Sequence, residues 1–333
     1  MDLINGGKMI EIGSFLEFDL LSSNEYYNGK NVARLNSARS GIYHSMCVLK
    51  CSSIYLPFYE CYTVRDFLIS KGITVKYYSI SESFEPLIEN VIEDDSAVLI
   101  VNYFGVMGQN RMKSLSSRFK NVIIDNAQAF YSKPLKKCLT VYSARKFFGV
   151  PDGCYVLGIN AGKFIDKYEQ DNSASTSNYL FERIEVGCST AYSSRMKNEE
   201  RIDKSDILRM SKLTLAILKN EPYSLIKQKR VSNFNYTHEL FKELNLINPI
   251  MYIDEECVPM IYPLVVDNNS IVKKLNENKI YTGRWWNYLL NETKKDSFEN
   301  KLSSFLIPIP IDQRYDLKEI NYVFSIIKKL LNE

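Results

Sequence analysis

Two segments in the middle of the chain carry residue types that can do chemistry on a small molecule. Asp125 lies near the end of the β-type run 121–127, and Gln128 follows three residues later. Lys146 comes shortly after the next strand-like run, 138–144. Working residues of parallel sheets sit at the carboxyl ends of the strands, so these side chains are expected to face one crevice above a sheet.

An acid and a lysine placed in this way match the needs of pyridoxal phosphate. The lysine amine can bind the aldehyde, and the carboxylate can keep the pyridine nitrogen protonated, so that the ring withdraws electrons. The same residues also have ordinary interpretations. A carboxylate at a strand end often caps a loop, and a lysine beside an arginine, here Arg145, often belongs to a solvated face. The spacing alone leaves both interpretations open.

The residues from about 30 to 160 alternate between short β-rich runs and helix-like runs. Strands are predicted at 52–57, 74–80, 96–104, 121–127, 138–144 and 153–158, and helices at 40–50, 59–72, 112–120 and within 82–92. The run 96–104 is apolar almost throughout, which is typical of a strand buried on both faces. This rhythm predicts an α/β fold with a large mixed, mostly parallel sheet and helices on its faces.

The pattern changes around residue 231. Before it, residues 206–219 form a periodic, helix-like run. After it, the sequence predicts a strand at 258–266, a helix at 270–280, an extended apolar segment at 303–311 and an amphipathic helix at 316–331. We therefore expect a large domain over residues 1–230 and a smaller α+β C-terminal domain over residues 231–333.

Composition and missing motifs exclude several classes of protein. With 45% hydrophobic and 24% charged residues, the chain is typical of globular proteins. Its net charge of +3 is too small to indicate nucleic acid or an anionic membrane as a partner. Only two histidines are present, which excludes a multi-histidine metal centre. The chain has neither a signal-peptide core nor an apolar run of about eighteen residues, so no membrane span is expected.

Two further observations restrict the kind of protein that this sequence can be. The glycine-rich motifs of nicotinamide and nucleoside triphosphate sites are not present. The seven cysteines are scattered, which favours buried free thiols in a reducing cytoplasm.

Several segments of the chain are similar, in the same order, to sequence blocks of one family. They are SGIYHSM (40–46), LPFYECYTVRDFLISKGITVKYYSI (56–80), VNYFGVMG (101–108), IIDNAQAF (123–130), SARKFFGVPDGCYV (143–156) and IPIPIDQRYDLKEI (307–320). The chain thereby resembles the DegT-type (DegT/StrS) sugar aminotransferases, which belong to fold type I of the pyridoxal-phosphate enzymes. The resemblance extends over most of the chain.

This resemblance implies a role for each matching residue. Lys146 matches the catalytic lysine that binds the cofactor, Asp125 matches the partner of the pyridine nitrogen, and Gln128 matches the glutamine that contacts the ring hydroxyl. The other implied positions are Ser40 and Gly41 for the phosphate cradle, Ser143 as a further phosphate contact, Tyr59 or Tyr62 for stacking on the ring, and Arg209 for the site of the partner subunit. Without the family, a helix cap for Ser40 and a helix-surface position for Arg209 are equally good interpretations.

The chain departs from the family at three positions. Cys61 stands where the ring-stacking aromatic residue is expected, Val141 replaces a serine before the lysine, and Ile207 replaces an asparagine before Arg209. These changes leave room for a non-catalytic or regulatory protein with the same fold. Another pyridoxal-phosphate reaction on a sugar nucleotide is a further alternative. Lys146 argues against dehydration, because the dehydratases of the family carry histidine there.

Taken together, the residues and the resemblance imply a cytoplasmic aminotransferase in surface polysaccharide biosynthesis. Its expected substrates are a nucleotide-linked keto-sugar and an amino-acid donor, glutamate, and its expected cofactor is pyridoxal 5'-phosphate. A homodimer with shared active sites is expected, with no metal, nucleic acid or membrane as partner. The adjacent residues Trp285 and Trp286 either stack on a sugar or base, or fill the seam between the domains.

Overall fold

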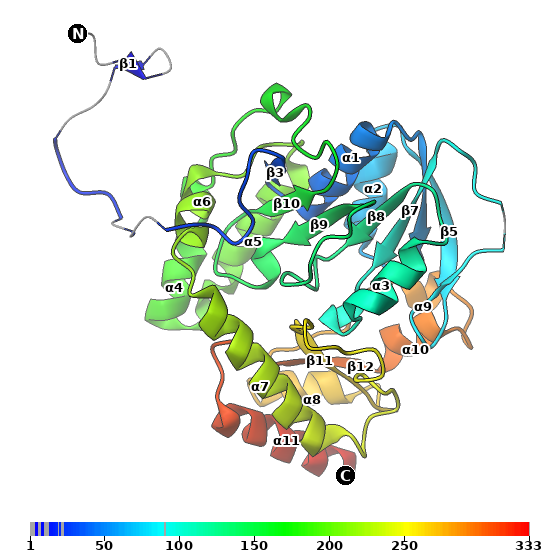
Figure 1. Ribbon diagram of the computed structural model, residues 1–333. Helices are drawn as coiled ribbons and strands as arrows, with labels where there is room; N and C mark the ends of the chain where they lie inside the picture. Colours follow the sequence, from blue (N-terminus) through cyan, green and yellow to red (C-terminus); the bar gives the residue numbers. More distant parts are fainter. Residues whose placement is uncertain are drawn as a thin grey trace.

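An eight-stranded sheet forms the centre of the larger part of the molecule (Figure 1). The computed structural model describes residues 4–5, 8–9, 13–18, 20, 23–89 and 91–332. The strands of the sheet run in the order β3-β10-β9-β8-β7-β4-β5-β6. Their bounds are β3 Val32–Leu35, β4 Ser53–Pro57, β5 Thr74–Ile80, β6 Pro86–Leu87, β7 Ser96–Val101, β8 Val122–Asp125, β9 Leu139–Ser143 and β10 Cys154–Leu157. A separate pair is formed by β1 Ile4–Asn5 and β2 Lys8–Met9.

The strand directions confirm the mixed, mostly parallel sheet. β5, β4, β7, β8 and β9 pair in parallel, one beside the next. β10 is antiparallel to both β9 and β3, and β6 is antiparallel to β5. β7 is buried along its whole length, as its apolar run indicates. The carboxyl ends of the parallel strands therefore share one edge of the sheet.

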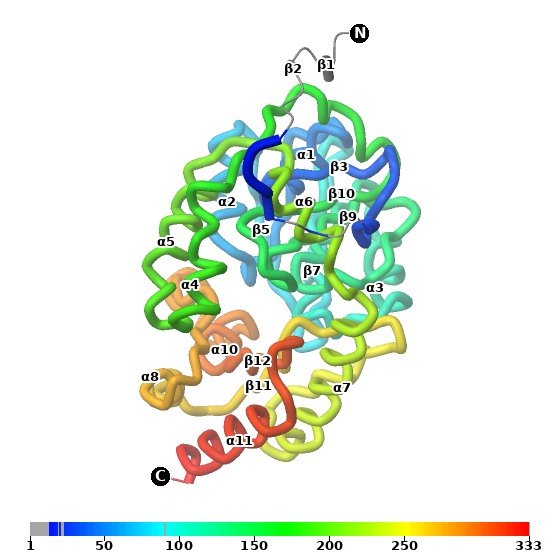
Figure 2. Tube along the Cα trace, turned by 90° about the vertical axis from the view of Figure 1, so that its left-hand side faces the viewer, coloured from blue at the N-terminus to red at the C-terminus, as the bar shows by residue number. Residues whose placement is uncertain are grey.

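Helices cover both faces of the large sheet (Figure 2). α1 (Ala38–Leu49) and α2 (Tyr62–Ser70) lie on one face, and α3 (Gln109–Ser116) lies on the other. Three more helices follow along the chain: α4 Asn178–Val186, α5 Cys188–Lys204 and α6 Lys212–Leu218. The fold class is thus α/β, as predicted.

Helix α1 approaches the sheet closely because of a glycine. The helix begins after Ser37, whose Oγ accepts the N–H of Ser40. A Cβ atom on Gly41 would lie 2.7 Å from Cys154 Sγ and 2.9 Å from Val141 Cγ1, on β10 and β9. Gly41 therefore has a packing role of its own, since a larger residue would push α1 away from the strands.

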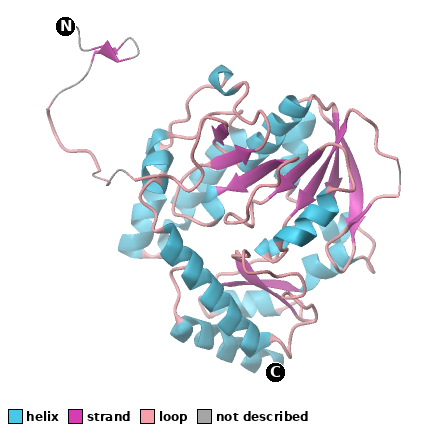
Figure 3. Ribbon diagram, in the orientation of Figure 1, coloured by secondary structure: helices cyan, strands magenta, loops and turns pink. Residues whose placement is uncertain are grey.

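A second, two-stranded sheet and its helices form the smaller part of the molecule (Figure 3). β11 (Ile261–Val265) and β12 (Leu306–Pro310) are antiparallel. The helices are α7 Tyr223–Phe241, α8 Ile271–Glu277, α9 Leu289–Glu292, α10 Phe298–Phe305 and α11 Leu317–Asn332. Residues 230 and 231 lie inside α7, so the division into residues 1–230 and 231–333 stays a prediction.

Three expected elements differ from the structure. The described residues of 82–92 contain no helix but the short strand β6. Phe84 has a φ of 58°, in the left-handed region, and Pro86 lacks the N–H that a helix needs. In the run 206–219 only α6 is helical, and residues 206–211 are non-helical. The first residues of 303–311 belong to α10 rather than to an extended segment.

All seven cysteines are free, as expected, but only Cys51, Cys138, Cys154 and Cys257 are buried. In the ranges that the structure describes, no helix combines the length and the apolar character needed to cross a membrane.

Candidate active site

Turns from four neighbouring strands meet where β4, β7, β8 and β9 end. We call this region the carboxyl edge; its turns comprise residues 58–61, 102–105, 126–128 and 144–147. Backbone hydrogen bonds join neighbouring strand ends. Asn102 N donates to Asp125 O over 2.9 Å, and Asn126 N donates to Val141 O over 2.8 Å. The edge is therefore a fixed frame for the side chains that it carries.

Asp125 is the last residue of β8, and its side chain is buried. Its Oδ1 accepts the N–H of Ala127 over 2.7 Å. No other hydrogen bond from the described residues reaches the carboxyl, so Oδ2 remains for a ligand. Burial raises the pKa of Asp125, whereas the positive charge of Lys146 and the Ala127 N–H lower it. Asp125 and Lys146 are thus close enough for their charges to interact.

Gln128 joins the turn after β8 to the turn after β7. Its Oε1 accepts the N–H of Phe104 over 2.8 Å, which leaves the Nε2 donor for a ligand. Gly105 permits this close approach, because its φ is 76° and a Cβ atom there would lie 2.7 Å from Gln128 O. Phe104 O in turn accepts the N–H of Met260 over 2.8 Å. The same turn therefore connects the large sheet with the smaller part of the molecule.

Lys146 ends the short 3-10 helix η2 (Ala144–Lys146), directly after β9. Its side chain is exposed, and its ammonium makes no hydrogen bond or ion pair with the described residues. The neighbouring Arg145 is different, because it pairs with Glu199 of α5 at 2.5 Å. The charge of Lys146 instead lowers the pKa of Asp125 and of Glu60. The lysine therefore belongs electrostatically to the carboxyl edge, and the arginine belongs to a pair with α5.

Two residues that the sequence analysis missed hold the peptide after Lys146. Phe147 O accepts from Gln313 Nε2 over 2.8 Å and from Arg230 Nη2 over 3.4 Å. Arg230 is only 2% exposed, and it also donates to Met260 O over 3.1 Å. These partners are 166 and 83 positions away from Phe147 in the chain, so no local pattern marks them.

Glu60 is a second buried carboxyl at the carboxyl edge, and its place there was not expected. It follows β4, and its Oε1 accepts the N–H of Cys61 over 2.7 Å. Its Oε2 is buried without a partner among the described residues. Burial, and then the charge of Asp125, raise the pKa of Glu60 to about 8, although the Cys61 N–H and Lys146 act against this rise. In the sequence, an acid just before a helix is explained equally well by compensation of the helix dipole, so the residue type alone does not mark Glu60 as part of a site.

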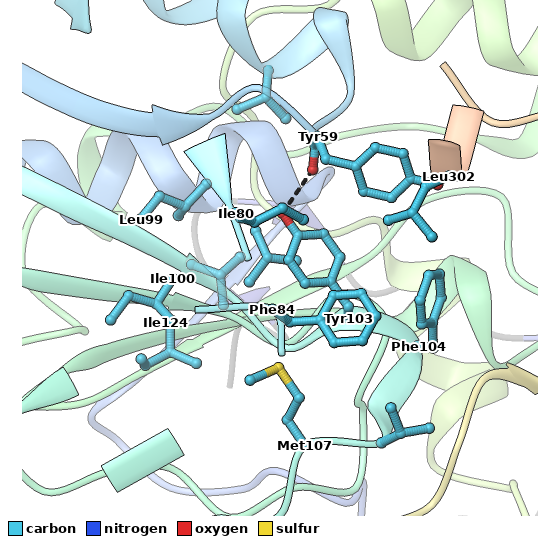
Figure 4. Close-up of a cluster of buried hydrophobic side chains, with 14 of the residues drawn as sticks. Tyr59, Ile80, Phe84, Leu99, Ile100, Tyr103, Phe104, Met107, Ile124 and Leu302 are labelled. Atoms are coloured by element: carbon cyan, nitrogen blue, oxygen red, sulfur yellow. Dashed lines mark hydrogen bonds between the residues drawn. The ribbon is translucent and has the colours of Figure 1, made fainter. Parts of the chain in front are cut away.

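The two tyrosines expected as alternatives for ring stacking lie in different places. Tyr59 is fully buried, with its ring centroid 4.5 Å from that of Trp286. Tyr103 donates its hydroxyl to Tyr59 O over 2.8 Å, and the hydroxyl of Tyr59 is buried without a partner among the described residues (Figure 4). Tyr62 is exposed at the start of α2 and meets Tyr288 edge-on. One ring is thus enclosed and the other exposed, and the stacking role stays a prediction for both.

The expected phosphate contacts lie around the start of α1 and the end of β9. Ser40 N donates to Ser37 Oγ over 3.3 Å, and Gly41 N donates to Ser37 O over 3.0 Å. The N–H groups that have no acceptor in the described residues are those of Ala38 and Arg39, at the very start of the helix. Ser143 is buried at the end of β9. The phosphate roles of Ser40, Gly41 and Ser143 stay predictions.

Arg209 lies in the non-helical segment before α6 and not on a helix surface. Its N–H donates to Glu169 O over 2.7 Å, and its carbonyl accepts the N–H of Asp171 over 2.9 Å. Its Nε is buried without a partner among the described residues. No contact in the described part of the chain links it to Asp125 or Lys146. Its expected service to a partner subunit stays a prediction.

The two tryptophans pack at the junction of the two parts of the molecule. Trp285 lies with its ring centroid 5.7 Å from that of Phe104, and Trp286 contacts Tyr59. This placement favours the interpretation that they fill the seam.

Comparison with solved structures finds the same fold in several proteins, aminotransferases among them. NtdA from Bacillus subtilis with bound cofactor PMP is 17% identical, with a TM-score of 0.63 and coverage of 91% of this chain and 73% of that chain. A DegT DnrJ EryC1 StrS aminotransferase from Brucella abortus is 14% identical, with a TM-score of 0.61 and coverage of 90% and 85%. The sugar aminotransferase CalS13 from Micromonospora echinospora is 14% identical, with a TM-score of 0.59 and coverage of 90% and 87%. The chain has the fold of the DegT-type sugar aminotransferases.

The predicted family resemblance and the predicted fold type I architecture are thereby confirmed at the level of the fold. Comparisons with protein-family models and with curated protein sequences find no match. The relationship to the DegT-type fold is therefore visible in the arrangement of the elements, where sequence identity is low.

Proposed function

We propose that this chain is a pyridoxal-phosphate-dependent aminotransferase that acts on a nucleotide-linked keto-sugar. The observation that carries the proposal is the placement of Asp125 and Lys146. Asp125 ends β8, Lys146 follows the parallel neighbour β9, and the charge of the lysine acts on the buried carboxyl. The bound PMP in the structurally similar NtdA supports the same cofactor class.

The residues at the carboxyl edge fit this cofactor. Asp125 Oδ2 and Gln128 Nε2 remain available to a ligand, and the Tyr59 hydroxyl is buried without a partner among the described residues. Buried polar groups are nearly always hydrogen-bonded, so an unpaired hydroxyl here is compatible with a missing ligand. When bound, pyridoxal phosphate supplies an aldehyde for the lysine amine and a ring that withdraws electrons.

The side chains of this chain then have separate tasks. Asp125 holds a proton on the ring nitrogen, and Gln128 Nε2 donates to the ring hydroxyl oxygen. Lys146 Nζ takes the proton from the α-carbon of the amino-acid donor and later returns a proton. The N–H groups at the start of α1, with Ser40, Gly41 and Ser143 nearby, bind the phosphate. Tyr59, with Tyr62 as the alternative, contacts the face of the ring.

The substrates and the assembly are proposed from the family resemblance. The amino donor is glutamate, and the aminated sugar enters surface polysaccharide biosynthesis in the cytoplasm. The active form is a homodimer in which Arg209 serves the site of the other subunit. The sugar aminotransferases among the similar structures support a sugar as substrate.

Reconstitution tests the proposal directly. The purified chain is mixed with pyridoxal phosphate, reduced with borohydride, digested and analysed by mass spectrometry. We expect the label on Lys146, and no label at this position in Lys146→Ala. With glutamate and no sugar, the loaded protein is expected to release about one equivalent of 2-oxoglutarate per site, as a ping-pong enzyme does. A label confined to other lysines would overturn the proposal.

Cys61, at the position expected for the stacking aromatic residue, favours one alternative function. Cys61 immediately precedes α2, with its Sγ 3.1 Å from Thr63 Oγ1, and a cysteine offers no aromatic surface. A regulatory member of the fold would bind pyridoxal phosphate at Lys146 but release no 2-oxoglutarate. The same reconstitution therefore separates the two functions.

A further inference from the structure

Glu60 is held rigidly at the carboxyl edge, next to the proposed cofactor residues. Its N–H donates to Phe58 O over 2.9 Å, and its carbonyl accepts the hydroxyl of Tyr288. The side chain is 7% exposed, so it cannot turn freely into solvent. Lys146 forms no ion pair with its carboxyl.

The hydrogen bonds indicate where the proton of a neutral Glu60 lies. Oε1 accepts the N–H of Cys61 over 2.7 Å, and in a neutral acid the carbonyl oxygen is the stronger acceptor. The proton therefore belongs on Oε2, which is buried without a partner among the described residues. Burial of an unpaired carboxylate oxygen is costly, and a neutral acid avoids most of this cost.

The groups around Glu60 decide the effect of its ionisation. Those that interact with its charge come from several elements: Asp125 of β8, Lys146 of η2, Tyr78 of β5, Tyr103 of the turn after β7, and Tyr288 before α9. Arg65 and Glu292 line a small cavity next to Glu60, and they form an ion pair of 3.0 Å. Lys146 is therefore the cation that balances the two buried carboxyls.

The charge balance leads to a simple consequence. With Glu60 neutral, the ammonium of Lys146 matches the single carboxylate of Asp125. With Glu60 ionised, the same space holds one ammonium and two carboxylates. A phosphate ester carries nearly two negative charges at neutral pH, so the second state repels it.

We propose that Glu60 sets the charge of the cofactor site: as a neutral acid it allows a phosphorylated pyridine to bind, and as a carboxylate it weakens that binding. This inference rests on the proposed function, because it concerns the same ligand. It adds a residue that neither the sequence pattern nor the family roles assigned. The raised pKa of Glu60, about 8, places the change within the range of an ordinary titration.

The test uses pyridoxine 5'-phosphate, which lacks the aldehyde and therefore binds without a bond to Lys146. Its dissociation constant is measured by calorimetry at about pH 7 and about pH 9 for the full chain and for Glu60→Gln. We expect the affinity of the unaltered chain to fall about tenfold more over this range than that of Glu60→Gln. Titration of the ligand itself affects both proteins alike and cancels in the comparison.

Two further variants make the test specific. Glu60→Met also lacks the charge and cannot donate a hydrogen bond, so it is expected to behave like Glu60→Gln if charge is the cause. Glu221→Gln is the matched control, because burial raises the pKa of Glu221 too, but it does not act on Asp125 or Lys146. It is expected to follow the unaltered chain.

The outcomes separate this inference from the proposed function. Equal pH profiles for the unaltered chain and Glu60→Gln would overturn the role of Glu60 and leave the aminotransferase proposal in place. A flattened profile in Glu221→Gln would also overturn it. No binding by the unaltered chain at either pH, together with no label on Lys146, would overturn both.

Discussion

The guanidinium of Arg230 lies over the ring of Phe147, 4.5 Å from its centre, while one of its nitrogens donates to the carbonyl of that same residue. Phe147 directly follows Lys146, so α7 holds the peptide that carries the proposed catalytic amine. Since Arg230 also donates to Met260 O, one buried side chain connects the lysine segment with the second sheet.

Replacing Arg230 is expected to destabilise the whole chain. Arg230→Met removes the buried hydrogen bonds to Met260 O, Phe147 O and Gln313 Oε1. Because buried carbonyls then lose donors, we expect the free energy of unfolding to fall by about 2–4 kcal/mol, measured by urea denaturation. Lys204→Met is the control: its pair with Glu200 is exposed on both sides, and its loss is expected to stay below about 1 kcal/mol. Equal losses of unfolding free energy in both variants would contradict the role of Arg230 in holding the segment after Lys146.

The ionisation of Glu60 predicts a specific dependence of stability on pH. Its pKa is raised to about 8 in the folded chain and is near 4.5 when unfolded, so between these values the folded state binds one proton more. The free energy of unfolding therefore falls as the pH rises through this window, by about 1.4 kcal/mol per pH unit for this group. Denaturation at several pH values is expected to show a smaller fall for Glu60→Gln. Parallel curves for the two proteins would refute the raised pKa.

Gly105 and Gly72 provide a matched pair of substitutions. Both have positive φ, 76° and 79°, but only a Cβ on Gly105 meets another atom, Gln128 O at 2.7 Å. We expect Gly72→Ala to cost about 1–2 kcal/mol of stability from backbone strain alone. Gly105→Ala adds a clash with rigid backbone, worth roughly another 1–3 kcal/mol. Thermal unfolding measures both, and a similar loss in the two variants would show that the turn can move away from Gln128.

Because the hydroxyl of Tyr59 has no partner among the described residues, we expect its removal to affect ligand binding but not stability. Tyr59→Phe removes a buried group that has no partner among the described residues, so we expect the unfolding free energy to stay within about 0.5 kcal/mol or to rise. If the hydroxyl contacts the ligand, the dissociation constant of pyridoxine 5'-phosphate is expected to rise about fivefold to tenfold, as for one lost hydrogen bond. A large loss of stability would mean that this hydroxyl already has a partner.

Much of the large sheet could be predicted because its signals are local. The apolar run of β7 and the strand ends at Asp125 and before Lys146 depend on residue types that stand next to one another. The helix expected within 82–92 failed for a local reason as well, since Phe84 takes the left-handed conformation and Pro86 follows. These residues form a turn and the short strand β6 instead of a helix.

The surroundings of the site could be predicted only in part. Arg230 looks in the sequence like an ordinary surface residue of a helix, and its burial depends on Gln313 and Phe147, which lie far away along the chain. Glu60 is next to a predicted strand end, but its nearness to Asp125 follows from the strand order, which single-sequence patterns do not specify. Residue types in the sequence thus indicated Asp125 and Lys146. Glu60 and Arg230, by contrast, could be recognised as parts of the site only from the folded structure.

The pairing of Arg209 with residues 169–171 has a consequence for how this protein can diverge. After residue 171 the chain passes through α4 and α5 and returns at residues 206–211. There, Asp171 N donates to Arg209 O over 2.9 Å. The first and last residues of this excursion are thus held together by backbone hydrogen bonds. Because Glu199 of α5 pairs with Arg145, next to Lys146, insertions or deletions are expected to leave the frame for Asp125 and Lys146 intact only at the tip of this excursion, around Gly187.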